Sequence, residues 1–244
     1  MQQLWMTVRD NRRIARDVFR MELEGGGLEE CRPGQFISLK LEDLFLRRPI
    51  SIFDQEGDRL RIIYKVVGRG TEELSAMGPG KQLDVLTGLG NGYDLEKAGE
   101  SPLLLGGGVG VPPLHYLARK LRERGKTVTA VLGFNTREEV FGEAEFRALG
   151  CETIVATADG SLGRKGFVTD VMPERYSYYY TCGPEPMLKA VYRTAKGSGQ
   201  FSLEERMGCG FGACMGCTCQ TAGGPKRICR EGPVLEKEEL LWDA

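Results

Sequence analysis

The first 97 residues carry the short alternations of apolar and polar side chains that are typical of β-strands. Such alternation runs through Phe36–Leu41 and, more loosely, through Leu60–Val67, as expected of strands that bury one face. Turn-forming clusters such as Gly25–Gly27 and Met77–Gly80 separate these runs. Regular short strands punctuated in this way predict an antiparallel barrel or sandwich over residues 1–97.

The pattern changes near residue 98, where strands begin to alternate with helices. Pro102–Leu105 is a short apolar run with the length of a buried strand, whereas Pro112–Arg124 places its apolar residues on one helical face. Further strands are expected at Val128–Phe134, Thr153–Ala156 and Tyr178–Thr181. Further helices are expected near Glu143–Leu149 and starting near Pro186. This order predicts βαβ units around a doubly wound parallel sheet over residues 98–198.

Residues 199–244 form a third predicted segment, which is rich in glycine and cysteine. It is too short to bury an apolar core of its own, so a bound metal is expected to supply the missing stability. The fold class predicted for the chain is therefore a multidomain β and α/β protein with a small C-terminal metal domain.

Charge and hydropathy exclude several classes of protein. The 244 residues contain 33 Lys and Arg against 34 Asp and Glu, a net charge of -1, which lacks the basic excess of a nucleic-acid binder. We find no apolar run of about 18 residues and no basic stretch followed by an apolar one at the N-terminus, so neither a membrane span nor a secretory signal is expected. These features predict a cytoplasmic protein, in which disulfides are rare and clustered cysteines indicate a metal site.

Five of the eight cysteines lie within 21 residues of the third segment. Four of them, Cys209, Cys214, Cys217 and Cys229, have the plant-type spacing of a [2Fe–2S] cluster, C-x4-C-x2-C followed by a distant fourth cysteine. A structural zinc site is the alternative, because Cys-x2-Cys pairs are also common zinc ligands. Cys219 breaks the spacing, and we interpret it as a small packing residue.

Glycine makes up 34 of the 244 residues, about 14% where about 7% is usual. Gly106, Gly107, Gly108 and Gly110 join a predicted strand to a predicted helix, where small residues let a nucleotide pyrophosphate approach the backbone and the helix N-terminus. The loop departs from G-x-G-x-x-G, and a glycine-rich packing turn is the alternative.

A second loop, Cys182, Gly183 and Pro184, follows another strand and precedes another helix, at the end of the sheet where ligands of open α/β sheets bind. Cys182 could line a nicotinamide pocket or be a buried structural cysteine. Residues 135–139 follow the second strand, and there the acids disfavour a 2′-phosphate whereas Arg137 favours one.

The barrel segment contains two weaker signals. Arg48-Pro49-Ile50-Ser51 offers a guanidinium for a phosphate and a hydroxyl for a cofactor ring, although such a tetrad is usually an ordinary strand edge. Gly70 and Thr71 offer backbone N–H groups and a hydroxyl for another phosphate. His115, the only histidine, is interpreted as a helix-face residue and not as a catalyst.

The order of these motifs resembles the ferredoxin–NADP reductase superfamily, with R-P-x-S in a flavin barrel followed by G-G-G-x-G and C-G-P in a nucleotide domain. More narrowly, the whole chain resembles the family of electron-transfer subunits of class 1B, NAD-dependent dihydroorotate dehydrogenase. The most specific residues are those of the R-P-I-S tetrad, Tyr64-Lys65, Gly70-Thr71, Asp159-Gly160-Ser161, the run from Cys209 to Cys219, and Cys229-Arg230-Glu231-Gly232-Pro233-Val234.

The resemblance implies an FAD-binding barrel over residues 1–97, an NAD-binding domain over 98–198 and a [2Fe–2S] domain over 199–244. It implies flavin contacts from two groups of residues, namely Arg48, Pro49, Ile50 and Ser51, and Ile63, Tyr64 and Lys65. It also implies phosphate contacts from Gly70 and Thr71 and cluster ligation by Cys209, Cys214, Cys217 and Cys229. The gap between Cys217 and Cys229 is shorter than this family leads us to expect.

The function implied is electron transfer from a separate FMN-containing dihydroorotate dehydrogenase subunit, through the cluster and FAD, to NAD+ in pyrimidine biosynthesis. Two copies of each subunit would form a heterotetramer, with no catalytic acid or base in this chain. One alternative is the small subunit of a ferredoxin–NAD(P) oxidoreductase or sulfide dehydrogenase type complex, in which an aspartate typically replaces the first cluster cysteine, here Cys209. The other is a non-catalytic, zinc-stabilised nucleotide-binding module.

Overall fold

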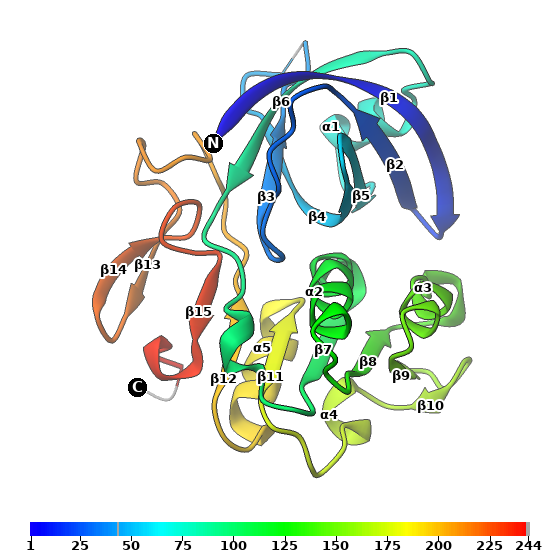
Figure 1. The fold of residues 1–244 in the computed structure, drawn as a ribbon, viewed down its shortest axis with the longest axis vertical. Helices are drawn as coiled ribbons and strands as arrows, with labels where there is room; N and C mark the ends of the chain where they lie inside the picture. Colours follow the sequence, from blue (N-terminus) through cyan, green and yellow to red (C-terminus); the bar gives the residue numbers. More distant parts are fainter. Residues whose placement is uncertain (43, 243–244) are drawn as a thin grey trace.

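The computed structural model describes residues 1–42 and 44–242. Six strands close an antiparallel barrel in the order β1-β2-β5-β4-β3-β6 (Figure 1). Their bounds are β1 Gln2–Ala15, β2 Val18–Glu24, β3 Phe36–Leu39, β4 Arg48–Glu56, β5 Arg59–Lys65 and β6 Gln82–Leu89, and the short helix α1, Arg69–Ser75, follows β5. The structure thus decides between the two predicted architectures in favour of a barrel.

Alternation along the strands separates the barrel interior from the face that meets the rest of the molecule. On β5, Leu60, Ile62 and Tyr64 belong to the barrel core. Ile63 points the other way and packs with the residues of the second domain, as the two-residue period of a strand requires. The barrel is therefore apolar on its inside and partly apolar on the outward face of β4 and β5.

The second domain is a seven-stranded sheet in the order β10-β9-β8-β7-β11-β12-β15. Its strands are β7 Leu103–Gly107, β8 Thr129–Phe134, β9 Glu152–Thr157, β10 Arg164–Lys165, β11 Tyr179–Cys182, β12 Gly199–Ser202 and β15 Val234–Glu236. Its helices are α2 Pro112–Glu123, α3 Glu143–Ala148, α4 Val168–Val171 and α5 Glu185–Thr194, with short 3-10 turns at Leu95–Ala98, Gly108–Gly110, Arg137–Glu139 and Lys237–Glu239. All neighbouring strands are parallel except β12 and β15.

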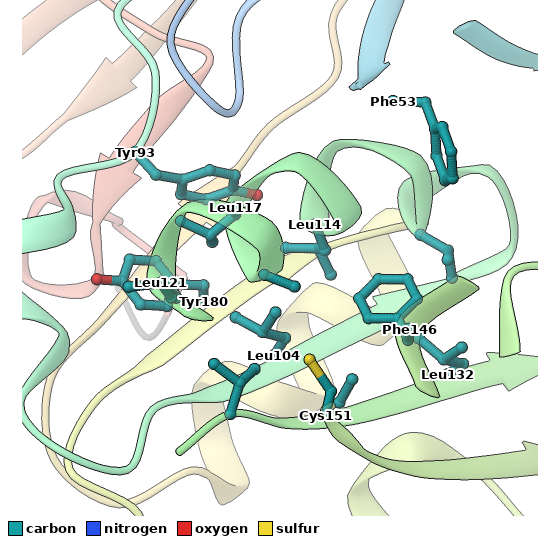
Figure 2. Close-up of a cluster of buried hydrophobic side chains, with 14 of the residues drawn as sticks. Phe53, Tyr93, Leu104, Leu114, Leu117, Leu121, Leu132, Phe146, Cys151 and Tyr180 are labelled. Carbon is teal, nitrogen blue, oxygen red and sulfur yellow. The ribbon is translucent and has the colours of Figure 1, made fainter. Parts of the chain in front are cut away.

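Helices cover both faces of this sheet, which confirms the doubly wound prediction. Leu104 packs with residues of α2 and α3 on one face, and Figure 2 shows it beneath Leu114 and Leu117 of α2. Leu103 and Leu105 point to the opposite face and pack with residues of α4 and α5. The apolar run of β7 is continuous because both of its faces are buried.

The cysteine-rich segment is built into the sheet at both of its ends. Strand β12, at its start, lies beside β11, and β15, near its end, pairs antiparallel with β12. The predicted division at 198/199 therefore separates strands that share one sheet. Residues 203–233 lie outside the sheet and contain the hairpin of β13, Thr218–Thr221, and β14, Gly224–Arg227. Strand pairing anchors a segment that is too short to form its own core.

Helix α2 lies between the sheet and the barrel (Figure 1). Its His115 ring stacks on Phe53 of β4, and Tyr116 donates a hydrogen bond to the carbonyl of Cys31. The side chain of His115 is buried, so the predicted helix-face histidine lies at the contact between the two domains. Among the described residues, no helix has the length and apolarity needed to span a bilayer.

Candidate cofactor sites

The loop from Gly208 to Gly216 folds around two of the four cysteines. The amides of Ala213 and Cys214 donate to Cys209 Sγ at 3.2 and 3.4 Å. The amides of Cys209 and Gly216 donate to Cys214 Sγ at 3.4 and 3.5 Å. Gly210 and Gly212 have φ of 80° and 95°, a left-handed conformation that glycine adopts without strain. The loop thus presents backbone donors to both sulfurs.

The other two cysteines form a second pair in a different environment. The amide of Cys229 donates to Cys217 Sγ at 3.4 Å, and each residue is only 2% exposed. They lie in the same apolar cluster as Phe36 and Leu89 of the barrel. The hairpin of β13 and β14 spans the residues between them, so the short gap in the sequence is bridged by a simple two-stranded turn.

Backbone hydrogen bonds and burial shift the pKa values of one cysteine in each pair, Cys209 and Cys229, in opposite directions. Partial burial raises the pKa of Cys209, but the amides of Cys214, Phe211 and Ala213 outweigh it and lower that pKa to about 6. Burial raises the pKa of Cys229 to about 12, helped by its contact with Cys217. The thiol of Cys209 therefore favours the thiolate by itself, whereas the thiol of Cys229 needs a bound metal to ionise.

These pairs fit a two-iron cluster, which takes four cysteine ligands, two on each iron. Within residues 1–42 and 44–242, no three Cys, His, Asp or Glu side chains converge as a single metal ion would require. Cys219 lies on β13 opposite Lys226, half-buried against the apolar core. In this part of the chain its thiol has no hydrogen-bonded thiol partner. The arrangement therefore favours a two-iron cluster over a zinc site. It also favours Cys209, Cys214, Cys217 and Cys229 as the ligands, without Cys219.

Arg48 and Gly70, 22 positions apart in the sequence, lie together in the structure. A Cβ added at Gly70 would collide with Arg48 Nε, so glycine is what allows the guanidinium to lie over the start of α1. The Thr71 hydroxyl accepts hydrogen bonds from the amides of Val67 and Gly68 at 2.9 and 3.2 Å. The amides of the first turn of a helix have no intrahelical acceptor, so this corner offers both a cation and free N–H groups to a phosphate.

The neighbouring arginine has a different role. Arg47 Nη2 donates to Asp84 Oδ2 at 2.7 Å, and Arg47 Nη1 donates to the Asp84 carbonyl at 2.9 Å. Although burial raises the pKa of Asp84, hydrogen bonds from Arg47 and Gln3 hold it below its ordinary value. Arg47 is therefore committed to the barrel, and Arg48 is the arginine of the pair that is available to a cofactor.

The outward face of β4 and β5 carries only some of the residues that the resemblance implies as flavin contacts. Because side chains alternate, Pro49 and Ser51 share the face of Phe53, and Ile63 shares it on β5. Ile50 packs on the barrel core.

Tyr64 is inside the barrel, and its hydroxyl donates to Asn11 Oδ1 at 2.9 Å. Ile50 and Tyr64 can therefore offer only backbone groups at the outward face. Lys65 Nζ lies 3.5 Å from Glu139 of the second domain.

The two predicted nucleotide loops lie in contact at the carboxyl ends of neighbouring parallel strands, β7 and β11. A Cβ at Gly110 would collide with the backbone of Cys182 and Gly183, and one at Gly107 would collide with Met187 Sδ. Burial raises the pKa of Cys182 to about 12, so its thiol stays neutral. Gly183 and Pro184 lead directly into α5. The glycines let the two loops pack backbone to backbone.

Residues after β8 and β9 form a linked turn beside these loops. Asp159 Oδ1 accepts from the amide and hydroxyl of Ser161 at 2.9 and 2.6 Å. Ser161 Oγ in turn accepts from the Arg137 amide at 2.8 Å, and Arg137 Nε donates to the Ser161 carbonyl. The Glu139 carboxylate accepts from the backbone and side chain of Asn135. This rim therefore carries both Arg137, which favours a 2′-phosphate, and acidic side chains, which disfavour one.

Sequence reasoning missed two residues that connect the sites. Ser38 of β3 pairs with Pro49 of the R-P-I-S tetrad, and a Cβ at Gly210 of the cysteine loop would lie 3.7 Å from Ser38 Oγ. Asn91 holds the segment after Cys229, because its side chain bonds to the carbonyls of Glu231 and Val234 and accepts from the Val234 amide. The cluster of Gly88, Gly90 and Gly92 around Asn91 was the only local signal.

Comparisons with known proteins decide the family. A model of the iron–sulfur cluster binding domain of dihydroorotate dehydrogenase B matches residues 204–241. The electron transfer subunit of dihydroorotate dehydrogenase B (NAD(+)) from Geobacillus sp. is 46% identical over 99% of each chain. The same subunit from Fusobacterium nucleatum is 44% identical over 93% of this chain and 94% of its own. The chain belongs to this electron transfer subunit family.

A solved structure extends the comparison to the fold. A chain from the structure of the NADH-dependent reduced ferredoxin–NADP oxidoreductase has a TM-score of 0.89 and 33% identity, and the match covers 98% of this chain and 90% of that one. Both families suggested by the motifs are thus related to the chain over almost its whole length. Identity to the electron transfer subunit family is the higher of the two.

The paired cysteines give a prediction about cluster retention. We expect Cys229→Ser to lose the cluster, because one iron would be left with a single thiolate ligand, whereas Cys219→Ser keeps it. Iron content and visible absorbance after purification measure both variants. Full iron content in the Cys229 variant, or its loss in the Cys219 variant, would contradict the assignment of ligands.

Adjacent arginines give a second prediction. Arg48→Gln should weaken FAD binding at least about tenfold, because a charge-assisted phosphate contact is lost, while the melting temperature of the FAD-free protein stays close to wild type. Arg47→Gln should instead lower the free energy of unfolding by about 1–3 kcal/mol, because the buried Asp84 carboxylate loses its charged partner and keeps only Gln3. FAD titration and thermal unfolding distinguish them, and the reverse pattern would refute the distinction.

Proposed function

We propose that this chain is the electron-transfer subunit of an NAD-dependent dihydroorotate dehydrogenase B. In this role it receives electrons from a separate dihydroorotate-oxidising subunit and delivers them to NAD+, in pyrimidine biosynthesis. The observation that carries the proposal is the relationship to the electron transfer subunit family over 99% of both chains. It is supported by the four cysteines, the flavin motif and the nucleotide loops, which are all present in that one chain.

The residues described above suit three cofactors. FAD is assigned to the outward face of β4 and β5, with its phosphates near Arg48, Gly70 and Thr71. The cluster is assigned to Cys209, Cys214, Cys217 and Cys229. NAD+ is assigned to the loops at Gly106–Gly110 and Cys182–Pro184. When bound, FAD supplies the conversion between the single electrons of an iron–sulfur cluster and the hydride that NAD+ accepts.

The protein's own contribution is to bind and orient these groups. Gly210 of the cysteine loop lies near Ser38 of β3, which pairs with Pro49 of the flavin strand, and this proximity supports short electron transfer between cluster and flavin. Hydride transfer between a flavin and a nicotinamide needs no protein acid or base, and we assign none. The neutral thiol of Cys182 is suited to line the nicotinamide side of the site without adding charge.

The partner is proposed to be the FMN-containing catalytic subunit, in a heterotetramer with two copies of each chain. Phe211 and Met215, on the loop that carries Cys209 and Cys214, are 42% and 54% exposed. Large apolar side chains at the tip of a metal-binding loop are unfavourable in water and suit burial at a protein interface. We therefore place the catalytic subunit against this loop. Nucleic acid and membranes are not proposed as partners.

A cytoplasmic location is proposed on chemical grounds. All eight cysteines are free thiols in the structure, and four of them serve as the proposed cluster ligands. Free thiols persist in reducing compartments.

A second candidate is the small subunit of a ferredoxin–NAD(P) oxidoreductase complex, which the TM-score of 0.89 to such a chain favours. It shares the fold and the cofactors of the first proposal and differs in the protein that donates the electrons. The difference between 46% and 33% identity favours the dihydroorotate partner. The choice therefore depends on a reconstitution with each donor.

Reconstitution tests this function. Purified without oxygen, the chain should show flavin and iron–sulfur absorbance. When it is mixed with its matching dihydroorotate dehydrogenase subunit, dihydroorotate should reduce NAD+, and the Cys229→Ser variant should not support this reaction. NAD+ reduction by reduced ferredoxin but not by dihydroorotate would assign the chain to the second candidate. A colourless, zinc-containing protein would contradict both.

A further inference from the structure

One aromatic contact joins the two cofactor-bearing domains. The imidazole of His115 on α2 stacks on the Phe53 ring of β4, with centroids 4.1 Å apart and planes at 15°. Phe146 of α3 meets the imidazole edge-on at 5.4 Å. His115 is 5% exposed and Phe53 is 2% exposed, so the stack is closed to solvent. Figure 2 shows Phe53 lying over the N-terminal end of α2.

The same turns of α2 also bind the backbone of β4. His115 Nδ1 lies 3.3 Å from the carbonyl oxygen of Phe53. One helical turn later, Arg119 Nε donates to Asp54 Oδ1 at 2.8 Å, and Arg119 Nη2 donates to the Gln55 carbonyl at 2.6 Å. Three consecutive residues of β4 are therefore held by two residues of α2. This contact resists both sliding and rotation of the helix along the strand.

The contact lies close to both candidate cofactor sites. Phe53 follows Ser51 by two residues, about 7 Å along a strand. His115 is the fourth residue of α2, about 5 Å along the helix from Pro112, and Gly110 ends the 3-10 turn that precedes Pro112 with only Val111 between them. Phe53 and Ser51 belong to the same strand, whose pairing with β5 shifts register between Ile52 and Asp54, and no extended loop separates His115 from Gly110. A small shift at the stack therefore reaches both cofactors without being absorbed by a flexible loop.

Hydride transfer depends steeply on such shifts, because the reacting atoms must approach to about 3–3.5 Å and a misplacement of 1 Å costs about 100-fold in rate. We infer that His115 is a positioning residue for this step: its stack on Phe53 sets the separation between the flavin strand and the nucleotide helix. The inference rests on the proposed function, since it concerns hydride exchange between NADH and FAD. His115 would thus orient the two cofactors without taking part in the transfer of the hydride.

The test compares variants of the full chain carrying its FAD and cluster. His115→Ala removes the stack, and Phe53→Leu removes it from the other side. His115→Phe keeps a planar ring against Phe53. Leu121→Ala is the matched control for lost packing, because Leu121 lies at the far end of α2, near Tyr180 of the sheet (Figure 2), and is fully buried.

The measurement is rapid mixing with NADH at pH 8, in which NADH gives a hydride to FAD and leaves as NAD+. The limiting rate of flavin bleaching reports positioning, and the NADH concentration at half-maximal rate reports binding. We expect His115→Ala and Phe53→Leu to lower the limiting rate at least about tenfold, with NADH binding within about threefold of wild type. His115→Phe and Leu121→Ala should keep the limiting rate within about threefold.

The results separate this inference from the proposed function. If NADH bleaches the flavin of the wild-type protein but both stack variants keep its limiting rate, the positioning role is refuted and the function stands. The role is equally refuted if Leu121→Ala slows the step as much as they do, because lost packing alone would then explain the effect. If the wild-type chain carries no FAD, or NADH does not bleach it, the proposed function fails and the inference fails with it.

Discussion

The pairing of β3 with β4 is the constraint on which the arrangement of the three candidate sites depends. One strand pair places Ser38 opposite Pro49, so the cysteine loop, whose Gly210 lies near Ser38, lies near the flavin motif. The same strand, β4, carries Phe53, which joins it to the nucleotide helix. A change of register by one residue would turn Pro49, Ser51 and Phe53 into the barrel interior. The apolar core of the barrel fixes the register and therefore fixes the sites.

Charge and burial then divide similar residues into different roles. Arg47 and Arg48 are neighbours, yet one is held by a buried carboxylate and the other lies over Gly70. Cys209 lies among backbone donors that favour its thiolate, whereas Cys229 lies in an apolar core that opposes ionisation. A cluster held between two such pairs is bonded to a polar loop on one side and to the protein core on the other.

Much of the fold and of the cysteine site could be predicted from the sequence, for identifiable reasons. Helix α2 was predicted within one residue of its end because its apolar face has a clear helical period, and the cysteine spacing predicted the four thiols that the structure groups into two pairs. The fate of the last segment could not be predicted. Whether Val234–Glu236 pairs with β12 depends on contacts between distant residues, and no local pattern encodes them. The same limit hid Ser38 and Asn91, whose importance comes only from what lies opposite them.

The direction in which each side chain points was the other feature that the sequence could not predict. The resemblance implied runs of consecutive flavin contacts, but a strand alternates its faces, so Ile50 and Tyr64 turn inward while Pro49, Ser51 and Ile63 turn outward. Likewise, the sequence could place His115 on α2 but could not show that β4 covers it. Local pattern predicts elements and motifs, whereas the packing of one domain on another decides which side chains reach a site.

The central claim is that one chain brings an NAD site, a flavin and a [2Fe–2S] cluster into electronic contact. Anaerobic titration of the isolated chain with NADH, followed by electron paramagnetic resonance at low temperature, tests this claim most directly. The account predicts that NADH bleaches the flavin and also produces the signal of a reduced [2Fe–2S] cluster in the wild-type protein. The account would be contradicted if NADH bleached the flavin and left the cluster oxidised, although a low-potential chemical reductant, added to the same protein as a control, reduced that cluster.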